Sequence, residues 1–243
     1  MANHATTLLE TPLARIVDHD PRTAIIFDAL GLDYCCRGAE TLDTAARKQG
    51  LDIHAVTSQL EALGEVPAGG SLDEQWPDLA QLVDHIVERH HRYVRDTQPV
   101  ISAWLDKLVD RHGPRHPELT ALRDTFAGAA ADLIAHMNKE EQILFPHIVA
   151  IARHTPGDPP VSSPFGSLQN PIRAMEHEHL EAGDAFERMR ALTNGFAPPD
   201  DACTTYRLCY RELGRFERDL HRHVHLENHL LFPRAVQLEH AGA

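Results

Sequence analysis

One motif occurs twice in this chain and limits what the chain can fold into. His136 stands four residues before Glu140, and His223 stands four residues before Glu227. A Leu-Phe-Pro triplet follows each pair. Residues four apart on an α-helix share a face, with their Cβ atoms about 5–6 Å apart. Each motif therefore predicts a helix that presents an imidazole and a carboxylate together, and such a pair can hold a metal ion.

The repeat extends upstream of both pairs. His91 precedes His136 by 45 residues, and His179 precedes His223 by 44 residues. Each of these single histidines lies in a helical pattern of its own. The chain therefore consists of two copies of a helix pair, and each copy offers two histidines and one glutamate.

Apolar residues at spacings of three and four predict four long amphipathic helices and no strand. The first begins at a capping box, Ser71 to Glu74, and Pro99 should kink or interrupt it. The second covers about 117–152, the third begins near Pro171 and stops at Gly195, and the fourth begins near residue 200. We expect an all-α protein whose main domain is a four-helix bundle.

A small helical domain is expected before the bundle. A helix that opens at Pro21 stops at Gly31, a second is capped by Thr41, and a third covers about 52–63. The glycine-rich segment that follows has the composition of a flexible linker. The predicted organisation is an N-terminal Cys-Cys domain at 1–63, a linker at 64–71 and the bundle at 72–243.

The four inner helix faces are apolar except at one level, where histidines and glutamates replace apolar residues. Unpaired, such charges would cost several kcal/mol each inside a bundle. Two divalent cations bridged by both glutamates and a bridging oxygen satisfy the charges and leave an open position for a small ligand. Nitrogen and carboxylate ligands fit iron, manganese, cobalt or zinc, and helical bundles favour a di-iron centre. The predicted ligands are His91, His136, Glu140, His179, His223 and Glu227.

Acceptors for the second nitrogen of each ligand histidine are also predicted. Asp132 and Asp219 stand four residues before the paired histidines and are expected to fill that role, while Glu178, which adjoins His179, is a weaker candidate for an outer contact or a proton relay. A single histidine on an apolar face is more often a core residue than a ligand, but the duplication favours ligands. The surplus histidines are expected at the surface or at the rim of the site, and His90 is the alternative to its neighbour His91.

Charge and composition exclude several classes of function. The net charge of −13 gives no footprint for nucleic-acid binding. No apolar run approaches the ~20 residues that span a bilayer, so no membrane contact is expected. The first thirty residues do not resemble a signal peptide, which predicts a cytoplasmic protein with reduced cysteines.

Several longer motifs resemble a known family. They are Asp33-Tyr-Cys-Cys-Arg-Gly38, Lys139-Glu-Glu-Gln-Ile-Leu-Phe-Pro146, Met175-Glu-x-Glu-His179, Ala202-Cys-Thr-Thr205 and Leu226-Glu-Asn-x-Leu-Leu-Phe-Pro233. Residues 72–235 resemble a haemerythrin-like bundle, and residues 8–63 resemble the ScdA-type N-terminal domain of the repair-of-iron-centres proteins. The resemblance implies the same six metal ligands that the spacing predicts.

The resemblance also implies a function. Its members are cytoplasmic di-iron proteins of nitrosative or oxidative stress that repair, or donate iron to, damaged iron–sulfur clusters of client proteins. Binding or reduction of nitric oxide at the di-iron centre is an alternative, and the latter would make the chain an enzyme. A haemerythrin-like O2 or redox sensor or carrier is a second alternative, less favoured because oxygen carriers use more histidine.

The chain departs from the family pattern beside Cys35 and Cys36. The family usually has glycine directly after the cysteine pair, whereas here Arg37 intervenes before Gly38. A cation beside Cys36 would favour the thiolate. The pair is interpreted as an exposed redox or iron-transfer pair that could also join two chains into a homodimer, and the alternative is two small buried residues. Adjacent cysteines are expected to chelate one ion poorly.

Overall fold

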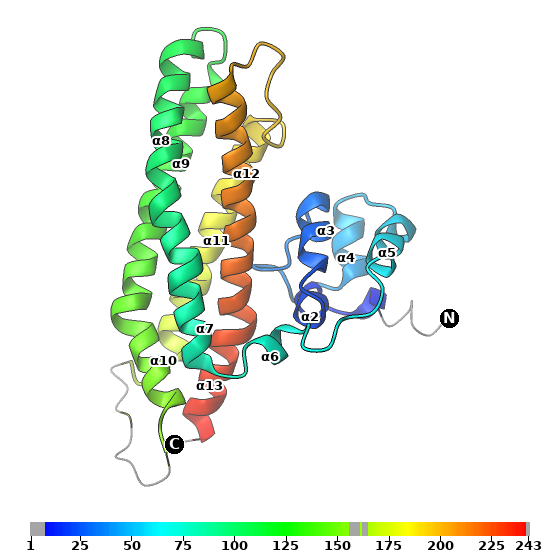
Figure 1. Ribbon diagram of the computed structural model, residues 1–243, viewed down its shortest axis with the longest axis vertical. Helices are drawn as coiled ribbons and strands as arrows, with labels where there is room; N and C mark the ends of the chain where they lie inside the picture. Colours follow the sequence, from blue (N-terminus) through cyan, green and yellow to red (C-terminus); the bar gives the residue numbers. More distant parts are fainter. Residues whose placement is uncertain (1–7, 156–160, 162–164, 242–243) are drawn as a thin grey trace.

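Four helical arms run up and down along one long axis in a computed structural model that describes residues 8–155, 161 and 165–241 (Figure 1). The first arm consists of α7 (Leu79–His85), η1 (Ile86–His91) and α8 (Arg92–His112). The second consists of α9 (Glu118–Lys139), η2 (Glu140–Leu144) and α10 (Phe145–Ala152). The third is α11 (Gln169–Leu192), and the fourth consists of α12 (Thr204–His225), η3 (Leu226–Leu231) and α13 (Phe232–Ala241). The expected four-helix bundle is confirmed, and no strand occurs among the described residues.

Two details of the first arm differ from the sequence prediction. The capping box at Ser71 forms, but its helix α6 (Leu72–Gln75) is short. Trp76 leaves the helical conformation because it precedes Pro77, and the arm begins again at Leu79 with Asp78 as its N-cap. Pro99 does not interrupt the first arm, since α8 continues through it, and a kink at Pro99 stays a prediction. Pro99 lies on the exposed side, where water can satisfy the carbonyl that loses its partner.

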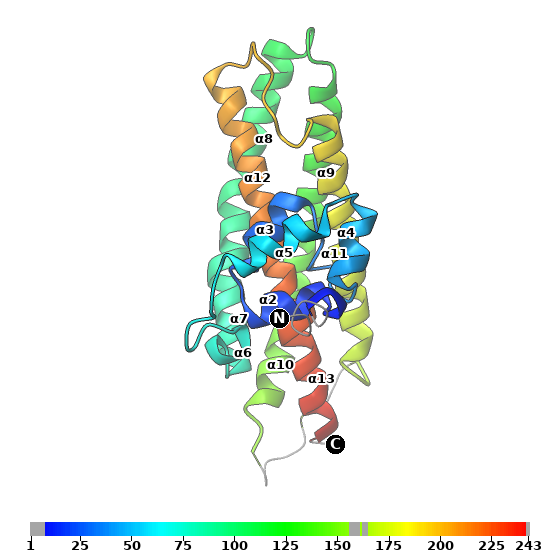
Figure 2. The same cartoon turned by 90° about the vertical axis from the view of Figure 1, so that its right-hand side faces the viewer.

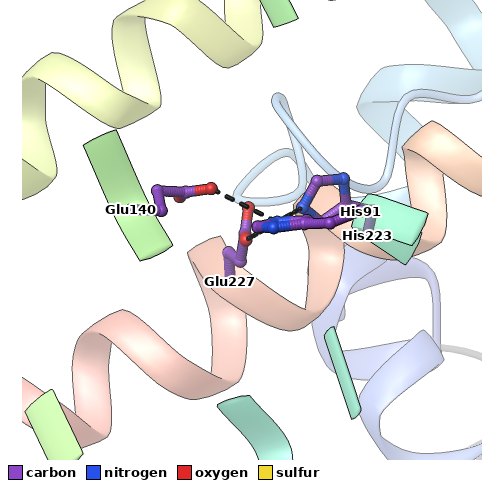
Figure 3. Close-up of side chains that lie close together, drawn as sticks. All are labelled: His91, Glu140, His223 and Glu227. Atoms are coloured by element: carbon purple, nitrogen blue, oxygen red, sulfur yellow. Dashed lines mark hydrogen bonds and ion pairs between the residues drawn. The ribbon is translucent and has the colours of Figure 1, made fainter. Parts of the chain in front are cut away.

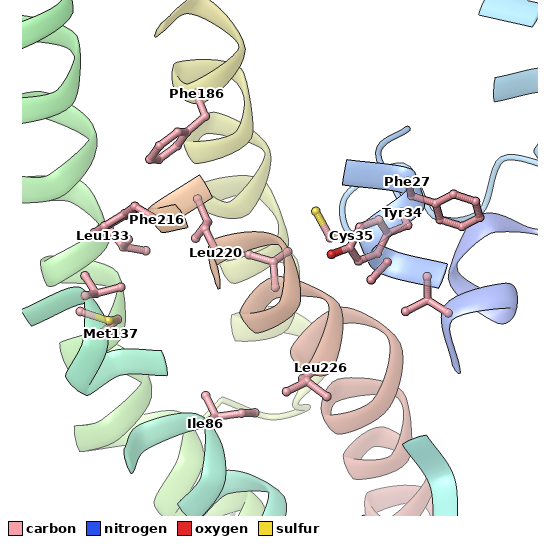
Figure 4. Packing of buried hydrophobic residues seen from close by; sticks show 14 of the residues in the cluster. Phe27, Tyr34, Cys35, Ile86, Leu133, Met137, Phe186, Phe216, Leu220 and Leu226 are labelled. Carbon is pink, nitrogen blue, oxygen red and sulfur yellow. The ribbon is translucent and has the colours of Figure 1, made fainter. Parts of the chain in front are cut away.

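Aromatic rings fill the upper part of the bundle core. Phe216 of α12 lies 5.6 Å from Phe186 of α11 and 5.7 Å from Phe126 of α9, measured between ring centroids. All three rings are buried. Figure 4 shows Phe186 above Phe216, Leu133 and Leu220. These contacts join three arms and fix the level at which the polar residues below them meet.

Short helices form the N-terminal part of the chain. They are α2 (Leu13–His19), α3 (Thr23–Leu30), α4 (Leu42–Lys48) and α5 (Ile53–Glu61). Thr41 caps α4 as expected, Asp52 caps α5, and Gly31 ends α3 with a positive φ of 68°. Helix α2 was not predicted. The division at 64–71 stays a prediction, although that segment separates α5 from α6.

The N-terminal helices pack against the bundle beside α11 and α12 (Figures 1 and 2). Contacts between carboxylates and imidazoles join the two parts, among them Asp28 with His221 at 2.8 Å and Asp18 with His225 at 3.0 Å. Apolar residues of both parts belong to one continuous buried cluster. Among the described residues, no helix is both long and apolar enough to cross a membrane.

Candidate metal centre

The six predicted ligands meet at one level of the bundle. Every arm contributes: His91 ends η1, His136 lies in α9 and Glu140 begins η2, His179 lies in α11, and His223 of α12 stands before Glu227 of η3. Each of the six is at most 2% exposed to solvent. The structure thus brings together residues that are up to 136 positions apart in the chain.

The six side chains form two overlapping groups of four. His91 and His223 belong to one group, His136 and His179 belong to the other, and both groups contain Glu140 and Glu227. Within each group the ligand atoms lie within 4.8 Å of one another. Figure 3 shows the first group, with Glu227 beside the two imidazoles and Glu140 facing it. The two groups therefore share both glutamates, and either group could hold a metal ion.

Each glutamate directs one oxygen toward each group. Glu140 places Oε2 3.4 Å from Nε2 of His91 and Oε1 3.3 Å from Nε2 of His136. Glu227 places Oε1 2.9 Å from Nε2 of His223 and Oε2 3.1 Å from Nε2 of His179. A carboxylate that offers one oxygen to each of two positions is the arrangement of a bridging ligand.

The donor set fits cations. In each group the two Nε2 atoms face each other at 3.0 Å. Both oxygens of Glu140 are buried and accept no hydrogen bond among the described residues. Buried carboxylate oxygens without a donor are costly unless a positive charge lies nearby. Imidazole and carboxylate suit iron, manganese, cobalt and zinc.

Electrostatics within the site favour cation binding. Burial lowers the pKa of His91, but the nearby carboxylates of Glu140 and Glu227 outweigh burial and raise this pKa to about 10. Burial also lowers the pKa of His136, but the carboxylate of Glu140 outweighs burial and raises this pKa to about 9. The histidines in turn hold the pKa of Glu140 and Glu227 below the ordinary value, against burial. When no metal is bound, protons on the histidines balance the negative charge of the two glutamates, as bound cations would.

Three of the four arms change from α-helix to π-helix at this level. Segment η1 ends at His91, η2 begins at Glu140, and η3 contains Glu227. Single π-helical turns inside α-helices frequently occur at functional sites. Segments η2 and η3 occupy the same position in the two sequence repeats. The sequence patterns had not indicated any of the three.

Three ligand histidines have an acceptor for their Nδ1 atom. Nδ1 of His136 contacts Oε2 of Glu178 at 2.8 Å. Glu178 also pairs closely with Lys139. Such an outer contact fixes the tautomer and the orientation of a ligand histidine.

Two further acceptors were not predicted. Nδ1 of His91 lies 2.7 Å from Oε1 of Glu141, and Nδ1 of His179 lies 2.9 Å from Oδ1 of Asn228. Glu141 and Asn228 each directly follow a bridging glutamate, at equivalent positions of the two repeats. An alignment of the repeats by their glutamates would therefore have identified both.

The roles predicted for Asp132 and Asp219 are wrong. Asp132 is exposed, because His136 turns its Nδ1 toward α11 and Glu178. Asp219 contacts Nδ1 of His90 at 3.1 Å. The ring of His90 stacks on that of His223, with centroids 5.6 Å apart, while Nδ1 of His223 is buried without a hydrogen-bond partner among the described residues.

Three of the surplus histidines are buried, although a surface or rim position was expected. His90, His147 and His225 are 4%, 9% and 2% exposed. His225 points away from the metal ligands and pairs with Asp18 of the N-terminal part. Burial of His225 therefore serves the contact between the N-terminal helices and the bundle, a role that sequence spacing does not reveal.

The cysteine pair lies between the N-terminal helices and the bundle. Cys35 is buried and Cys36 is partly exposed, so the expectation of an exposed pair is wrong for Cys35. A hydrogen bond with Cys36 and burial raise the pKa of the Cys35 thiol. Arg37 directs its guanidinium toward carboxylates, 3.8 Å from Asp33 and 3.9 Å from Asp184. Pairing between chains through this region stays a prediction.

The structure shows why glycine occupies position 38, one residue later than in the family pattern. A Cβ atom at this position would lie 2.3 Å from the backbone oxygen of Tyr34 and 2.7 Å from the side chain of Ala14. It would also lie 2.8 Å from Nε2 of His229. Only glycine permits this approach of the loop to α2 and the bundle.

Comparison with known proteins places the chain in a family. The model of the Hemerythrin HHE cation binding domain matches residues 82–235, and the ScdA_N model, a domain of unknown function (DUF542), matches residues 9–64. The chain is 34% identical to the iron-sulfur cluster repair protein YtfE of Enterobacter sp. (strain 638), over 93% of this chain and 97% of that protein. It is 37% identical to YtfE of Dickeya chrysanthemi (90% and 93%) and 31% identical to the iron-sulfur cluster repair protein ScdA of Staphylococcus haemolyticus (92% and 96%). With both domains matched and such relatives along nearly its whole length, the chain belongs to the repair-of-iron-centres family of haemerythrin-like proteins.

Proposed function

We propose that this chain holds two iron ions in its bundle and uses them to repair damaged iron–sulfur clusters during nitrosative or oxidative stress. One observation carries the proposal: two ligand groups that share both glutamates occur in a chain similar along its length to proteins named for iron-sulfur cluster repair. The clients are then iron–sulfur proteins. A cytoplasmic location is part of the same proposal.

The donor set supports two ions of one kind. His91 and His223 would hold one ion, His136 and His179 the other, and Glu140 and Glu227 would serve both. Bound iron would supply an exchangeable, redox-active ion. The protein residues exclude water from the ligands by burial, and outer contacts to Glu141, Glu178 and Asn228 orient three imidazoles.

The repair proposal can be tested with a [4Fe–4S] enzyme damaged by nitric oxide. We expect the iron-loaded protein to restore its activity faster than an equal amount of free ferrous ion does. A variant with both Glu140→Ala and Glu227→Ala should restore no more than the free ion. Recovery at the same rate with free iron, or full recovery with the double variant, would contradict the proposal.

Binding or reduction of nitric oxide is a second candidate function. Each proposed metal position receives two imidazoles and two carboxylate oxygens, fewer donors than the six that iron commonly accepts, so a small ligand could bind. The reduced protein should then change its absorption spectrum on mixing with nitric oxide. Release of N2O would indicate reduction. A changed spectrum that persists without release of N2O would indicate binding alone. An unchanged spectrum would exclude both.

A further inference from the structure

A second group of metal-ligand atoms lies outside the bundle centre. Asp33, Cys35 and Cys36 occupy the loop between α3 and α4, and one ligand atom from each lies within 4.8 Å of the others. Both cysteines are free thiols. This Asp33–Cys35–Cys36 cluster takes no part in holding the proposed iron ions.

The spacing of the sulfur and oxygen atoms matches a tetrahedral metal site. The two Sγ atoms are 3.7 Å apart, and Sγ of Cys35 is 3.3 Å from Oδ1 of Asp33. Metal–sulfur bonds of about 2.3 Å at the tetrahedral angle put two sulfurs ~3.8 Å apart, and a metal–oxygen bond of about 2.1 Å puts oxygen ~3.6 Å from sulfur. The observed separations agree within a few tenths of an ångström. Adjacent cysteines can therefore chelate one ion together here, contrary to the sequence-based expectation.

The loop that carries these residues is held in place from both sides. Oδ1 of Asp33 accepts hydrogen bonds from the backbone N–H groups of Cys35 and Cys36, at 3.2 and 2.8 Å. From the bundle, Asn228 and His229 both contact the backbone oxygen of Cys35, at 3.2 and 2.9 Å. Ligands fixed before the ion arrives lose little conformational entropy on binding it.

A pocket of about 570 Å³ opens beside the cluster, between the N-terminal helices and the bundle. Cys35 and Cys36 line it, and four further carboxylates surround them: Asp28, Asp184, Glu187 and Glu217. The cationic groups in its lining are Arg37, Arg190 and His221. With Asp33, carboxylates outnumber guanidinium groups, and this excess favours the entry of a cation.

We propose that Asp33, Cys35 and Cys36 form a second metal site, which binds one divalent transition-metal ion of borderline softness, such as Zn²⁺ or Fe²⁺. Two sulfurs exclude Mg²⁺ and Ca²⁺, which require oxygen ligands. Three protein ligands leave the fourth tetrahedral position open toward the pocket, so the ion is exchangeable rather than structural. The site does not depend on the function proposed for the bundle centre.

Cobalt(II) provides a direct test in the full-length protein, because only thiolate ligands give a strong sulfur-to-cobalt charge-transfer band. The bundle centre has no sulfur ligand, so this band reports the Asp33–Cys35–Cys36 cluster alone. We expect the wild-type protein, kept reduced with a phosphine and given enough cobalt to fill the bundle centre as well, to develop the band with the intensity of one thiolate-bound cobalt ion per chain. A wild-type protein without the band would overturn the proposal.

Variants distinguish this site from the other cysteines and from the bundle centre. Cys36→Ser should lose the band, whereas Cys203→Ser, which changes an exposed cysteine, should keep it. Asp33→Asn retains the acceptor that holds the loop and should weaken cobalt binding ~10-fold or more. The Glu140→Ala, Glu227→Ala double variant should keep the band, so failure of the bundle centre leaves this result unaffected. A band that persists in Cys36→Ser would overturn the proposal.

Discussion

Removal of the Glu178 side chain should weaken one of the two metal positions selectively. Glu178 is the acceptor for Nδ1 of His136, at 2.8 Å, and it also neutralises Lys139. Without Glu178, the imidazole of His136 loses its orientation and part of its basicity, and the ammonium group of Lys139 remains beside it. The metal affinity of the position formed by His136 and His179 should fall, while the position formed by His91 and His223 keeps all its contacts.

The expected size of the effect follows from the burial of this contact. Loss of an outer partner typically lowers metal affinity about 10- to 100-fold, or roughly 1.4–2.8 kcal/mol. The side chain of Glu178 is 29% exposed, so solvent screens part of its charge. We expect about tenfold for Glu178→Gln, which keeps an acceptor oxygen, and a larger loss, up to about 100-fold, for Glu178→Ala.

The assay is an anaerobic titration of metal-free protein with ferrous ion against a competing chelator. It should resolve two dissociation constants, of which Glu178→Ala raises one. Glu181→Gln is the matched control on the same helix, because its ion pair is with the exposed His177. Equal dissociation constants for wild type and Glu178→Ala, or the same loss in the control, would refute the reasoning.

Three further predictions concern metal loading, the core and acid stability. The Glu140→Ala, Glu227→Ala double variant should retain no metal in the bundle by elemental analysis, and two bound ions would contradict the site. Phe216→Ala should lower the free energy of unfolding by about 3–5 kcal/mol in urea denaturation, because the ring is 1% exposed and touches two other buried rings; a loss below about 1 kcal/mol would contradict that packing. The hydrogen bond from Arg22 is the main cause that lowers the pKa of Asp20, so the pair should stabilise the folded state fully above the ordinary pKa of 3.8 and lose this effect as the pH falls through the lowered value. Thermal unfolding followed by circular dichroism between about pH 5 and pH 3 should therefore show a smaller acid-induced loss for Asp20→Asn than for wild type, and identical losses would contradict it.

The sequence predicts the ligand set because the helical period encodes it. His136 and Glu140 share a face by spacing alone, and the upstream histidines complete the set once the duplication is recognised. Packing of the bundle then needs only to align the polar residues of the four helices at one height. The same reasoning fails for the residues that contact the ligand histidines from outside the site. Asp132 has the spacing of an acceptor for His136, but the direction of the imidazole depends on which helix lies next to it, and that helix presents Glu178.

Features set by contacts distant in sequence could not be predicted. The docking of the N-terminal helices depends on contacts between residues about two hundred positions apart, such as Asp28 with His221 and Asp18 with His225. No local pattern marks His225 as buried. The π-helical segments could not be predicted either. One extra residue in a helical turn rotates all later side chains about the helix axis, but it leaves the apolar composition unchanged.

The two ligand groups of the proposed centre have chemically unequal surroundings. The pseudo-twofold relation of the repeat equates Glu141 with Asn228, and Glu178, which precedes His179, with His90, which precedes His91. One histidine in each group therefore contacts a carboxylate: His91 through Glu141 and His136 through Glu178. The second histidines differ.

His179 contacts the amide of Asn228, whereas His223 meets the ring of His90 and has no acceptor for Nδ1 among the described residues. Because an acceptor raises the basicity of a ligand imidazole, the group of His136 and His179 donates more strongly than the group of His91 and His223. Symmetric ligands inherited from a duplication thus coexist with asymmetric surroundings. In the two-ion centre proposed above, this difference would give the two metal positions unequal affinity.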